Sequence, residues 1–305
     1  MTQPKLASAQ SGLGGRGYRD IFGDGGLLPS VTTVLNAIDR PGILQWSLDQ
    51  QAAWMAVNAA KLLDRDEEQA FRMGRFLPRK MKSSDFDDPM TDLRDSSSGV
   101  LNDLAELGDA VHEWIEADLT GGLEPDIFRI EQEQMIVEYL TWKQDHDIEV
   151  LAVEKTVYGD GYAGTFDSIL RIDGVATLVD NKTSRAIHDT NYGQLGALSA
   201  AHTMATEVPK GTEGAVEFTG TRNKVKETSY WVPEALPPIQ QHAILRLRPD
   251  DYDNNGNFVP AFCRLEVIDQ RLVDAGYEMF RGALQVRLAQ RKLKDVEKIL
   301  QKELF

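Results

Sequence analysis

The feature that most constrains the fold of this chain is a pair of alternating segments joined by Asp173-Gly174. Residues 163–172 (AGTFDSILRI) and 175–182 (VATLVDNK) have the two-residue period of β-strands, and Asp-Gly is a strong signal for a two-residue hairpin turn. Counting back from such a turn places Asp167 directly opposite Asp180. Cross-strand partners have Cβ atoms about 4.5–5.5 Å apart on one face of the sheet. The hairpin is therefore expected to bring two carboxylates together.

Two carboxylates at that separation repel each other unless something neutralises them. A divalent cation such as Mg²⁺ or Mn²⁺ is the natural partner, because hard cations prefer oxygen ligands. Lys182 lies two residues beyond Asp180, so strand alternation places it on the same face. An ammonium group there would position or activate a water molecule, or stabilise charge on a phosphate. The alternative is an ordinary hairpin with charged residues on a solvated face.

Three further positions are candidates for the same site. His112 and Glu116 are four residues apart and share a face of an expected helix. Either the imidazole binds the cation, or the pair is a half-buried histidine beside a surface glutamate. Glu154, on the preceding strand near Asp167, is read as a further ligand, a residue that holds water or a cross-strand charge. Gln194 lies on the following helix, where a lone glutamine is most often a surface residue.

The order of the expected elements is helices first and then a sheet. We expect a flexible arm at 1–20, and a helical region at 21–148 that contains a basic run and a mobile acidic loop. Residues 149–305 are expected to form the core, with a closing C-terminal helix, in one domain with 21–148. The pattern predicts an α+β or mixed α/β fold. The expected strands are 149–157, 163–172, 175–182, 243–248 and 261–267; the helices are 99–119, 126–144, 189–205 and 269–305; and 207–235 is a loop with a short strand.

Composition excludes several classes of protein. With 48 acidic and 33 basic residues the formal net charge is −15, which argues against a surface coated with basic residues for wrapping nucleic acid. The single cysteine, Cys263, excludes a disulfide framework and a four-cysteine iron–sulfur cluster. No apolar run approaches the roughly 18 residues of a membrane helix, and the first residues lack the apolar stretch of a secretory signal. The sequence therefore predicts a cytoplasmic protein that does not bind membranes.

Four short motifs together resemble the PD-(D/E)XK nuclease superfamily, and specifically its RecB-like phage recombination exonucleases. Gly108 to Glu113 looks like the G-x-x-x-H helix of that family, and Gly164 to Asp167 looks like its G-x-x-D strand. Asp180 to Ser184 looks like its D-x-K-T-[SG] strand, and Gln194 begins a segment where the family has Q-x-x-x-Y. Segments at 28–35 and 245–250 also look like parts of phage-encoded members, so that the likeness spans about residues 28–290.

The resemblance implies a restriction-endonuclease-like core, with a central mixed sheet flanked by helices and a helical N-terminal region. It also implies a metal-dependent deoxyribonuclease that hydrolyses phosphodiester bonds. Carried over residue by residue, His112, Asp167, Asp180 and the backbone carbonyl of Asn181 would bind Mg²⁺ or Mn²⁺. Lys182 would orient or deprotonate the attacking water. Gln194 would support that lysine or the DNA end.

Two departures from the family pattern refine these expectations. Leu198 stands where Q-x-x-x-Y has its tyrosine, so the role of that tyrosine is either absent or moved to Tyr192. Related CRISPR-associated nucleases usually carry an iron–sulfur cluster, which a chain with only Cys263 cannot build. The resemblance therefore favours an exonuclease that resects linear duplex ends, with a single-strand annealing recombinase as partner, in the host cytoplasm if the chain is phage-encoded. The residues expected to contact DNA are Arg72, Arg75, Arg79, Lys80, Lys82 and Tyr192.

Two alternatives remain open from the sequence. One is a structure-specific or spacer-trimming endonuclease without an iron–sulfur cluster. The other is a catalytically silent scaffold that binds DNA ends, although the intact Asp167, Asp180 and Lys182 argue against it. Cleavage polarity and the existence of an oligomer are not predicted.

Overall fold

The computed structural model describes residues 6–8, 15–38, 47–49, 51–52, 89–222, 225–253 and 256–303. It divides into two compact units, one of residues 1–38 with 108–305 and the other of residues 39–107. In the second unit the described residues are helical, at 47–49, 51–52 and 89–107. The predicted DNA-binding residues Arg72, Arg75, Arg79, Lys80 and Lys82 lie outside the described residues. All elements discussed below belong to the first unit, apart from the start of one long helix.

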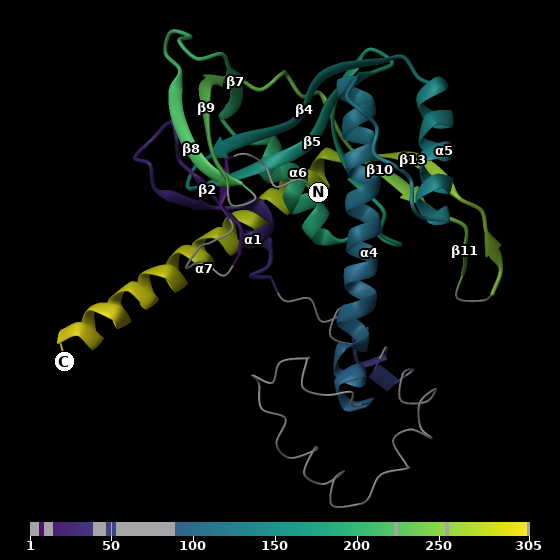
Figure 1. Cartoon of the computed structure of the whole chain (residues 1–305), viewed down its shortest axis with the longest axis horizontal. Coiled ribbons are helices and arrows are strands. Elements are labelled where there is room, and N and C mark those ends of the chain that lie inside the picture. The colour runs from purple at the N-terminus through teal and green to yellow at the C-terminus, as the bar shows by residue number, and fades with distance from the viewer. Residues whose placement is uncertain are drawn as a thin grey trace, which may run out of the picture. The chain divides into compact units, whose positions relative to one another are not determined.

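The first unit contains a large sheet with helices on its faces (Figure 1). The helices are α1 (Val31–Leu35), α4 (Pro89–Thr120), α5 (Ile130–Gln144), α6 (Asp189–Ser199) and α7 (Gln270–Glu303). The strands are β1 (Ala7–Ser8), β2 (Gly17–Arg19), β3 (Leu27–Pro29), β4 (Ile148–Gly159), β5 (Tyr162–Ile172), β6 (Val175–Lys182), β7 (Thr203–Val208), β8 (Val216–Arg222), β9 (Val225–Glu234), β10 (Gln241–Arg248), β11 (Asp251–Tyr252), β12 (Phe258–Val259) and β13 (Phe262–Ile268).

The central sheet has eight strands in the order β13-β10-β6-β5-β4-β7-β9-β8. Neighbouring strands are antiparallel except for β6 and β10, which are parallel, so the sheet is mixed. The prediction of a mixed central sheet flanked by helices is therefore confirmed, whereas its restriction-endonuclease-like form stays a prediction. In the part of the chain that the structure describes, no helix is long and apolar enough to cross a membrane.

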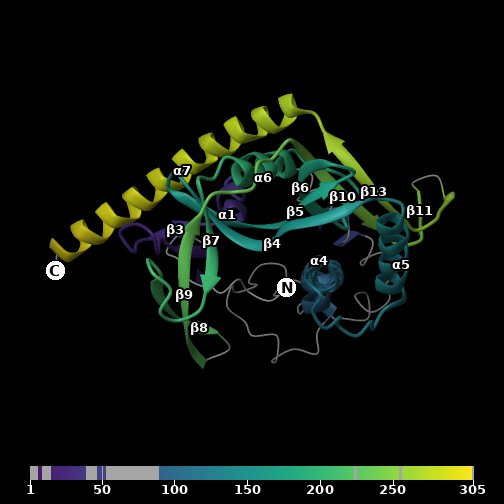
Figure 2. The ribbon, with the colours of Figure 1, turned by 90° about the horizontal axis from the view of Figure 1, so that it is seen from above.

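The helices α6 and α7 lie on one face of the sheet and α5 lies on the other (Figure 2). The ring of Phe280 on α7 packs edge-on against Tyr162 of β5, with 4.8 Å between ring centroids. Glycines let α6 and α7 approach closely, because a Cβ added at Gly276 would lie 2.4 Å from the carbonyl carbon of Tyr192. A Cβ at Gly196 would lie 2.8 Å from the carbonyl oxygen of Val273. These two positions therefore require glycine.

The hairpin of β5 and β6 has the predicted two-residue turn. Ile172 pairs with Val175, and the same register continues to Ser168 and Val179. Asp173 and Gly174 have φ angles of 50° and 87°, the left-handed backbone that a tight hairpin turn of this kind requires. The turn chemistry of two residues thus set the register of β5 and β6.

The N-terminal segment differs from the expected flexible arm in its described part. Strands β1, β2 and β3 form a small sheet, in which Leu6 and Tyr18 are buried. The hydroxyl of Tyr18 lies 3.0 Å from the Thr165 hydroxyl on β5, and Ser30 forms a parallel bridge with Ala163. Polarity and glycine content suggested an arm, but a few apolar side chains anchor the segment to the central sheet. Ser30 then caps α1 by accepting a hydrogen bond from the Thr33 amide.

Three further boundaries differ from the prediction. Residues 200–205 were expected to continue a helix, but α6 ends at Ser199 and β7 begins at Thr203. Residues 207–235 were expected to form mainly a loop, but β8 and β9 make a long hairpin there. Helix α4 begins at Pro89, so residues 89–98 of the expected acidic loop are helical. Proline suits the first turn of a helix, since its missing amide has no partner there in any case.

Candidate functional site

The candidate site lies where the backbone ladders on both sides of β5 are interrupted at Asp167. Towards β6, the last pair is Ser168 with Val179, so Asp167 and Asp180 are not backbone partners as predicted but lie just beyond the end of the ladder. Towards β4, pairing is interrupted between the Val153–Ser168 and Lys155–Phe166 pairs. At that interruption Glu154 has a φ of 47°, which is uncommon for a residue other than glycine. Asp167 therefore lacks a backbone partner on both neighbouring strands, although β6 stays paired with β10 as far as Lys182.

Side-chain contacts replace the missing ladder. The Asp167 carboxylate accepts a hydrogen bond of 2.7 Å from the backbone amide of Asn181. One carboxylate oxygen of Asp180 accepts from the side-chain amide of Gln194 at 2.9 Å, and the other lies 2.6 Å from the Lys182 Nζ. The Asp180 side chain is only 3% exposed. Gln194 is thus turned towards the sheet, rather than being the surface residue that is commonest at such a position.

His112 reaches this point from α4. Its Nδ1 lies 3.6 Å from an Asp167 carboxylate oxygen, which is too long for a hydrogen bond, and this buried nitrogen has no hydrogen-bond partner. The helix approaches the loop after β6 closely, because a Cβ added at Gly108 would lie 3.0 Å from the Thr183 hydroxyl oxygen. The glycine one turn before the histidine is therefore explained by the packing of α4 against this loop.

Burial and neighbouring charges have opposing effects on the pKa values of Asp180 and Lys182, the charged pair on β6. Burial raises the pKa of Asp180, and the Asp167 carboxylate adds to that effect, while the Lys182 ammonium and His112 oppose it. Burial alone would lower the pKa of Lys182, but the carboxylates of Asp180 and Asp167 outweigh it, so this pKa lies above the usual value. The buried ammonium is held by two nearby negative charges.

Glu154 adds a further carboxyl group to the site. Burial raises its pKa, as do the negative charges of Asp167 and of Glu116 on α4, and Arg16 acts against them. The sequence indicated Glu154, but it gave Glu116 no role beyond sharing a helix face with His112, and it did not point to Arg16. The four-residue spacing of His112 and Glu116 was the available signal, since both then face the same way.

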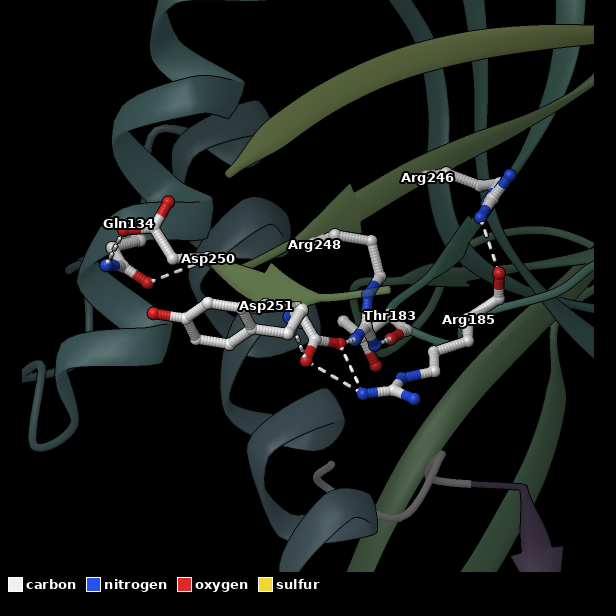
Figure 3. A network of polar contacts seen from close by, with 8 residues as sticks. Gln134, Thr183, Arg185, Arg246, Arg248, Asp250 and Asp251 are labelled. Carbon is white, nitrogen blue, oxygen red and sulfur yellow. Dashed lines mark hydrogen bonds and ion pairs between the residues drawn. The ribbon is translucent and has the colours of Figure 1, made fainter. Parts of the chain in front are cut away.

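Arginines hold the loop that follows β6 (Figure 3). Arg248 of β10 donates hydrogen bonds of 2.7 Å to the Thr183 carbonyl oxygen and to the Asp251 carboxylate. Arg185 donates to the same carboxylate, and Arg246 donates to the Arg185 carbonyl oxygen at 2.7 Å. Because Thr183 directly follows Lys182, the guanidinium of Arg248 fixes the backbone next to the buried ammonium. Sequence reasoning noted this segment but assigned Arg248 no task.

Leu198, which replaces the family's tyrosine, and Tyr192, which was considered for its role, have surroundings that the sequence did not predict. Leu198 is buried in the core, and a Cβ added at Gly164 would lie 2.7 Å from one of its methyl groups. Tyr192 packs against the core where α6 meets Gly276 of α7. Gln194 reaches Asp180 from α6, whereas the Cβ of Tyr192 faces α7. Among the predicted residues, the structure therefore does not bring Tyr192 together with the carboxylates.

The donor groups suit a divalent cation in their chemistry. The 3.6 Å between His112 Nδ1 and the Asp167 oxygen is within the span of about 4 Å that two ligands of one ion can have, when each bond is about 2.1 Å. The unpartnered imidazole nitrogen is a free donor for such an ion. Within the described residues, no three His, Cys, Asp or Glu side chains are grouped closely enough to hold a metal as they stand. Asp180, which Gln194 and Lys182 already contact, would have to provide the next oxygen.

Comparison of the chain with models of known protein families and with curated protein sequences finds no match.

Proposed function

We propose that this protein is a Mg²⁺- or Mn²⁺-dependent DNA exonuclease that hydrolyses phosphodiester bonds at duplex ends, in resection for phage-type recombination. The observation that supports this most is the meeting of His112, Asp167, Asp180, Lys182 and Gln194 at one interruption of the sheet. The five residues come from one helix, two strands and a second helix, so simple proximity in sequence does not explain their meeting. They are also the residues of four motifs that resemble those of RecB-like nucleases.

The side chains have distinct tasks in this proposal. His112, Asp167, Asp180 and the Asn181 carbonyl would hold the cation, which supplies a more acidic bound water and positive charge beside the phosphate. Gln194 fixes the orientation of the Asp180 carboxylate, which in turn positions Lys182. The Lys182 ammonium then orients the attacking water or stabilises charge that develops on the phosphate. Glu154 is close enough to Asp167 to hold a water molecule or a further ligand.

The alternative, an ordinary hairpin with charged residues on a solvated face, explains this arrangement less well. Strands that carry charges on a solvated face keep their ladder and leave the charges exposed. Here Asp180 and Lys182 are largely buried, the ladder is interrupted and a buried imidazole nitrogen has no partner. Such costs are typical of functional sites, where local strain and desolvation are retained for chemistry.

The test is digestion of linear duplex DNA with Mg²⁺ or Mn²⁺ by the wild type, Asp180→Asn and Lys182→Ala, with covalently closed circles as a second substrate. Asp160→Asn is the matched control, since Asp160 lies in another hairpin with a side chain that is 90% exposed. We expect the wild type and Asp160→Asn to degrade only linear DNA, and both site variants to lose this activity. Cleavage of closed circles would identify an endonuclease instead. No cleavage with either metal would leave the silent scaffold as the better explanation.

Metal binding is tested separately by calorimetric titration of the chain with Mn²⁺ in the absence of DNA. His112→Ala removes the unpartnered nitrogen, and His202→Ala removes an exposed histidine that lies 3.1 Å from Asp160. We expect His112→Ala to weaken Mn²⁺ binding about 10-fold or more and His202→Ala to leave it unchanged. Equal affinities in the two variants would contradict the assignment of His112 as a ligand.

A further inference from the structure

Helix α7 has an apolar stripe on the side that faces away from the sheet. Six large apolar side chains of this 34-residue helix are exposed, with Leu272 at 45% and Leu293 at 64%. The other four are Val286, Val296, Leu300 and, beside the stripe, Ile299, each about half exposed. Figure 1 shows that the C-terminal part of α7 extends beyond the sheet. A soluble helix ordinarily places polar residues on such a face.

The stripe follows a strict heptad repeat. Its members recur at alternating intervals of three and four residues, which is the spacing of positions a and d in a coiled coil. Most members are exposed, and Met279 is half-buried. We call this set the outer stripe: Leu272, Ala275, Met279, Gly282, Val286, Ala289, Leu293, Val296 and Leu300.

Apart from Met279, whose partly buried side chain packs against the core, the outer stripe is separate from the face by which α7 packs on its own sheet. The buried residues Val273, Phe280 and Leu284 lie on the opposite side of a helix with 3.6 residues per turn. Arg287 and Arg291 continue that inner face by donating hydrogen bonds to the carbonyl oxygens of Thr33 and Leu27. Helix α7 is therefore apolar on two opposite faces; the described core covers one of them and contacts the other at Met279.

We propose that the outer stripe binds the outer stripe of a second copy of this chain, in a parallel two-stranded coiled coil. Position a is large in every heptad, whereas position d is Ala, Gly or Ala in the first three, which lets the two helices approach closely. In a parallel pair, position g of one helix faces position e of the next heptad on the partner. Lys292 occupies a g position and Glu297 the following e position, so each helix places an ammonium opposite a carboxylate.

The charge pattern is the reason for choosing a second copy over another partner. A two-fold axis between the helices forms the Lys292–Glu297 pair twice, because each residue meets the other on the partner. The preceding g and e positions, Gln285 and Gln290, are neutral and bring no repulsion. This inference does not depend on the proposed nuclease activity, since the outer stripe includes none of the candidate site residues.

The experiment is sedimentation equilibrium of the full chain, over a range of protein concentrations. We expect the wild type to form a dimer and Leu293→Asp to dissociate it about 100-fold more readily, since burial of two leucines is lost. Lys294→Asp, at an outward position one residue further on, is the control and should leave the dimer intact. Because Leu293 is largely exposed in one chain, neither variant should change the thermal midpoint of a dilute sample. A monomeric wild type, or equal dissociation of both variants, would overturn the proposal.

Charge exchange and cross-linking test the orientation. Lys292→Glu should weaken the dimer about threefold to tenfold, and adding Glu297→Lys should restore it. In a Cys263→Ser background, Leu300→Cys should form a disulfide between two chains, because equivalent a positions face each other only in a parallel pair. Lys298→Cys, which faces outwards, should not. A dimer in which Leu300→Cys fails to cross-link would overturn the parallel arrangement.

Discussion

The two ends of the β5–β6 hairpin shift the pKa of an aspartate in opposite directions. At the turn, Asp173 is exposed, its carboxylate lies 2.7 Å from His146 Nδ1, and it accepts a hydrogen bond from the Asp147 amide. These contacts hold the pKa of Asp173 below its usual value. At the open end, burial raises the pKa of Asp180. One aspartate is therefore stabilised in its charged form by the fold, and the other is destabilised in that form.

This difference separates a role in folding from a role in chemistry. The regular ladder and the charged contacts at the turn favour the hairpin over other pairings, as expected of residues that specify a structure. At the open end, burial of the Asp180 carboxylate and the left-handed backbone of Glu154 oppose folding. Proteins retain such features mainly where activity requires them. Substitutions at the two ends should therefore separate activity from stability.

The largest expected effect is on activity at the open end. Asp180→Asn removes a charged oxygen ligand and the main partner of Lys182, so we expect the rate of duplex digestion to fall at least about 1,000-fold. Because Asn has the same shape and relieves repulsion with Asp167, the free energy of unfolding should change by less than about 2 kcal/mol. Activity assays and urea denaturation of the same preparation measure both quantities. If the loss of activity came only from unfolding, the open end would no longer differ from the turn in its role.

The second effect concerns the loop behind the site. Arg248→Lys cannot donate to both the Thr183 carbonyl and the Asp251 carboxylate, because an ammonium lacks the fork of the guanidinium. We expect the rate of digestion to fall about 10-fold, with little change in DNA affinity. Arg171→Lys is the matched control, since Arg171 makes an exposed ion pair with Glu149 at the turn end of β5. A similar loss of rate in both variants would show that the position of the Thr183 backbone is unimportant.

The third effect is on stability at the turn. Gly174→Ala places a Cβ at a φ of 87°, so we expect a loss of about 1–2 kcal/mol in the free energy of unfolding. Activity per folded molecule should stay unchanged, because the turn lies at the far end of the strand pair from Asp167 and Asp180. Gly174→Asn should cost less, since asparagine tolerates the left-handed backbone better. Urea denaturation of the wild type, Gly174→Ala and Gly174→Asn measures the order of their free energies of unfolding.

The smallest effect is a pH dependence at the same turn. Because the folded-state pKa of Asp173 is lowered, its stabilisation is present above the ordinary value of 3.8 and is lost as the pH falls through the folded pKa. Asp173→Asn should therefore lower the thermal midpoint slightly at pH 7, and the difference from the wild type should shrink below about pH 4. Thermal melts between pH 3 and pH 7 give the comparison. A difference that grows in acid would contradict the sign.

Much of the hairpin could be predicted, because its signals are local. The two-residue turn and the strand period correctly gave the register from Ile172–Val175 to Ser168–Val179. The final step from that register was wrong, since the strands separate before Asp167 and Asp180 become backbone partners. Local signals do not show this, because beyond Val179 strand β6 stays paired with β10, which lies more than 60 residues later in the chain, as far as Lys182.

The end of α6 and the surroundings of Tyr192 show the same limit. The apolar pattern that predicted a helix to residue 205 arises because α6 and β7 are both buried. The spacing of apolar residues alone does not separate a short helix from a buried strand that follows it. The expected contact of Tyr192 with DNA stays a prediction, but its packing was not foreseen, since its Cβ faces Gly276 on α7, 84 residues later in the chain. The packing partner of a residue depends on elements that its neighbours in sequence do not reveal.

The sequence by itself determined the β5–β6 hairpin, the mixed sheet with helices around it, and the set of residues that suggested a metal site. These follow from backbone periodicity, turn chemistry and charge, which act over a few residues. Only the tertiary structure decided that His112 and Gln194 reach the carboxylates, that Arg248 holds the Thr183 backbone, and that Glu154 is strained beside Asp167. Such contacts join residues far apart in the chain, and their geometry depends on how whole helices and strands pack.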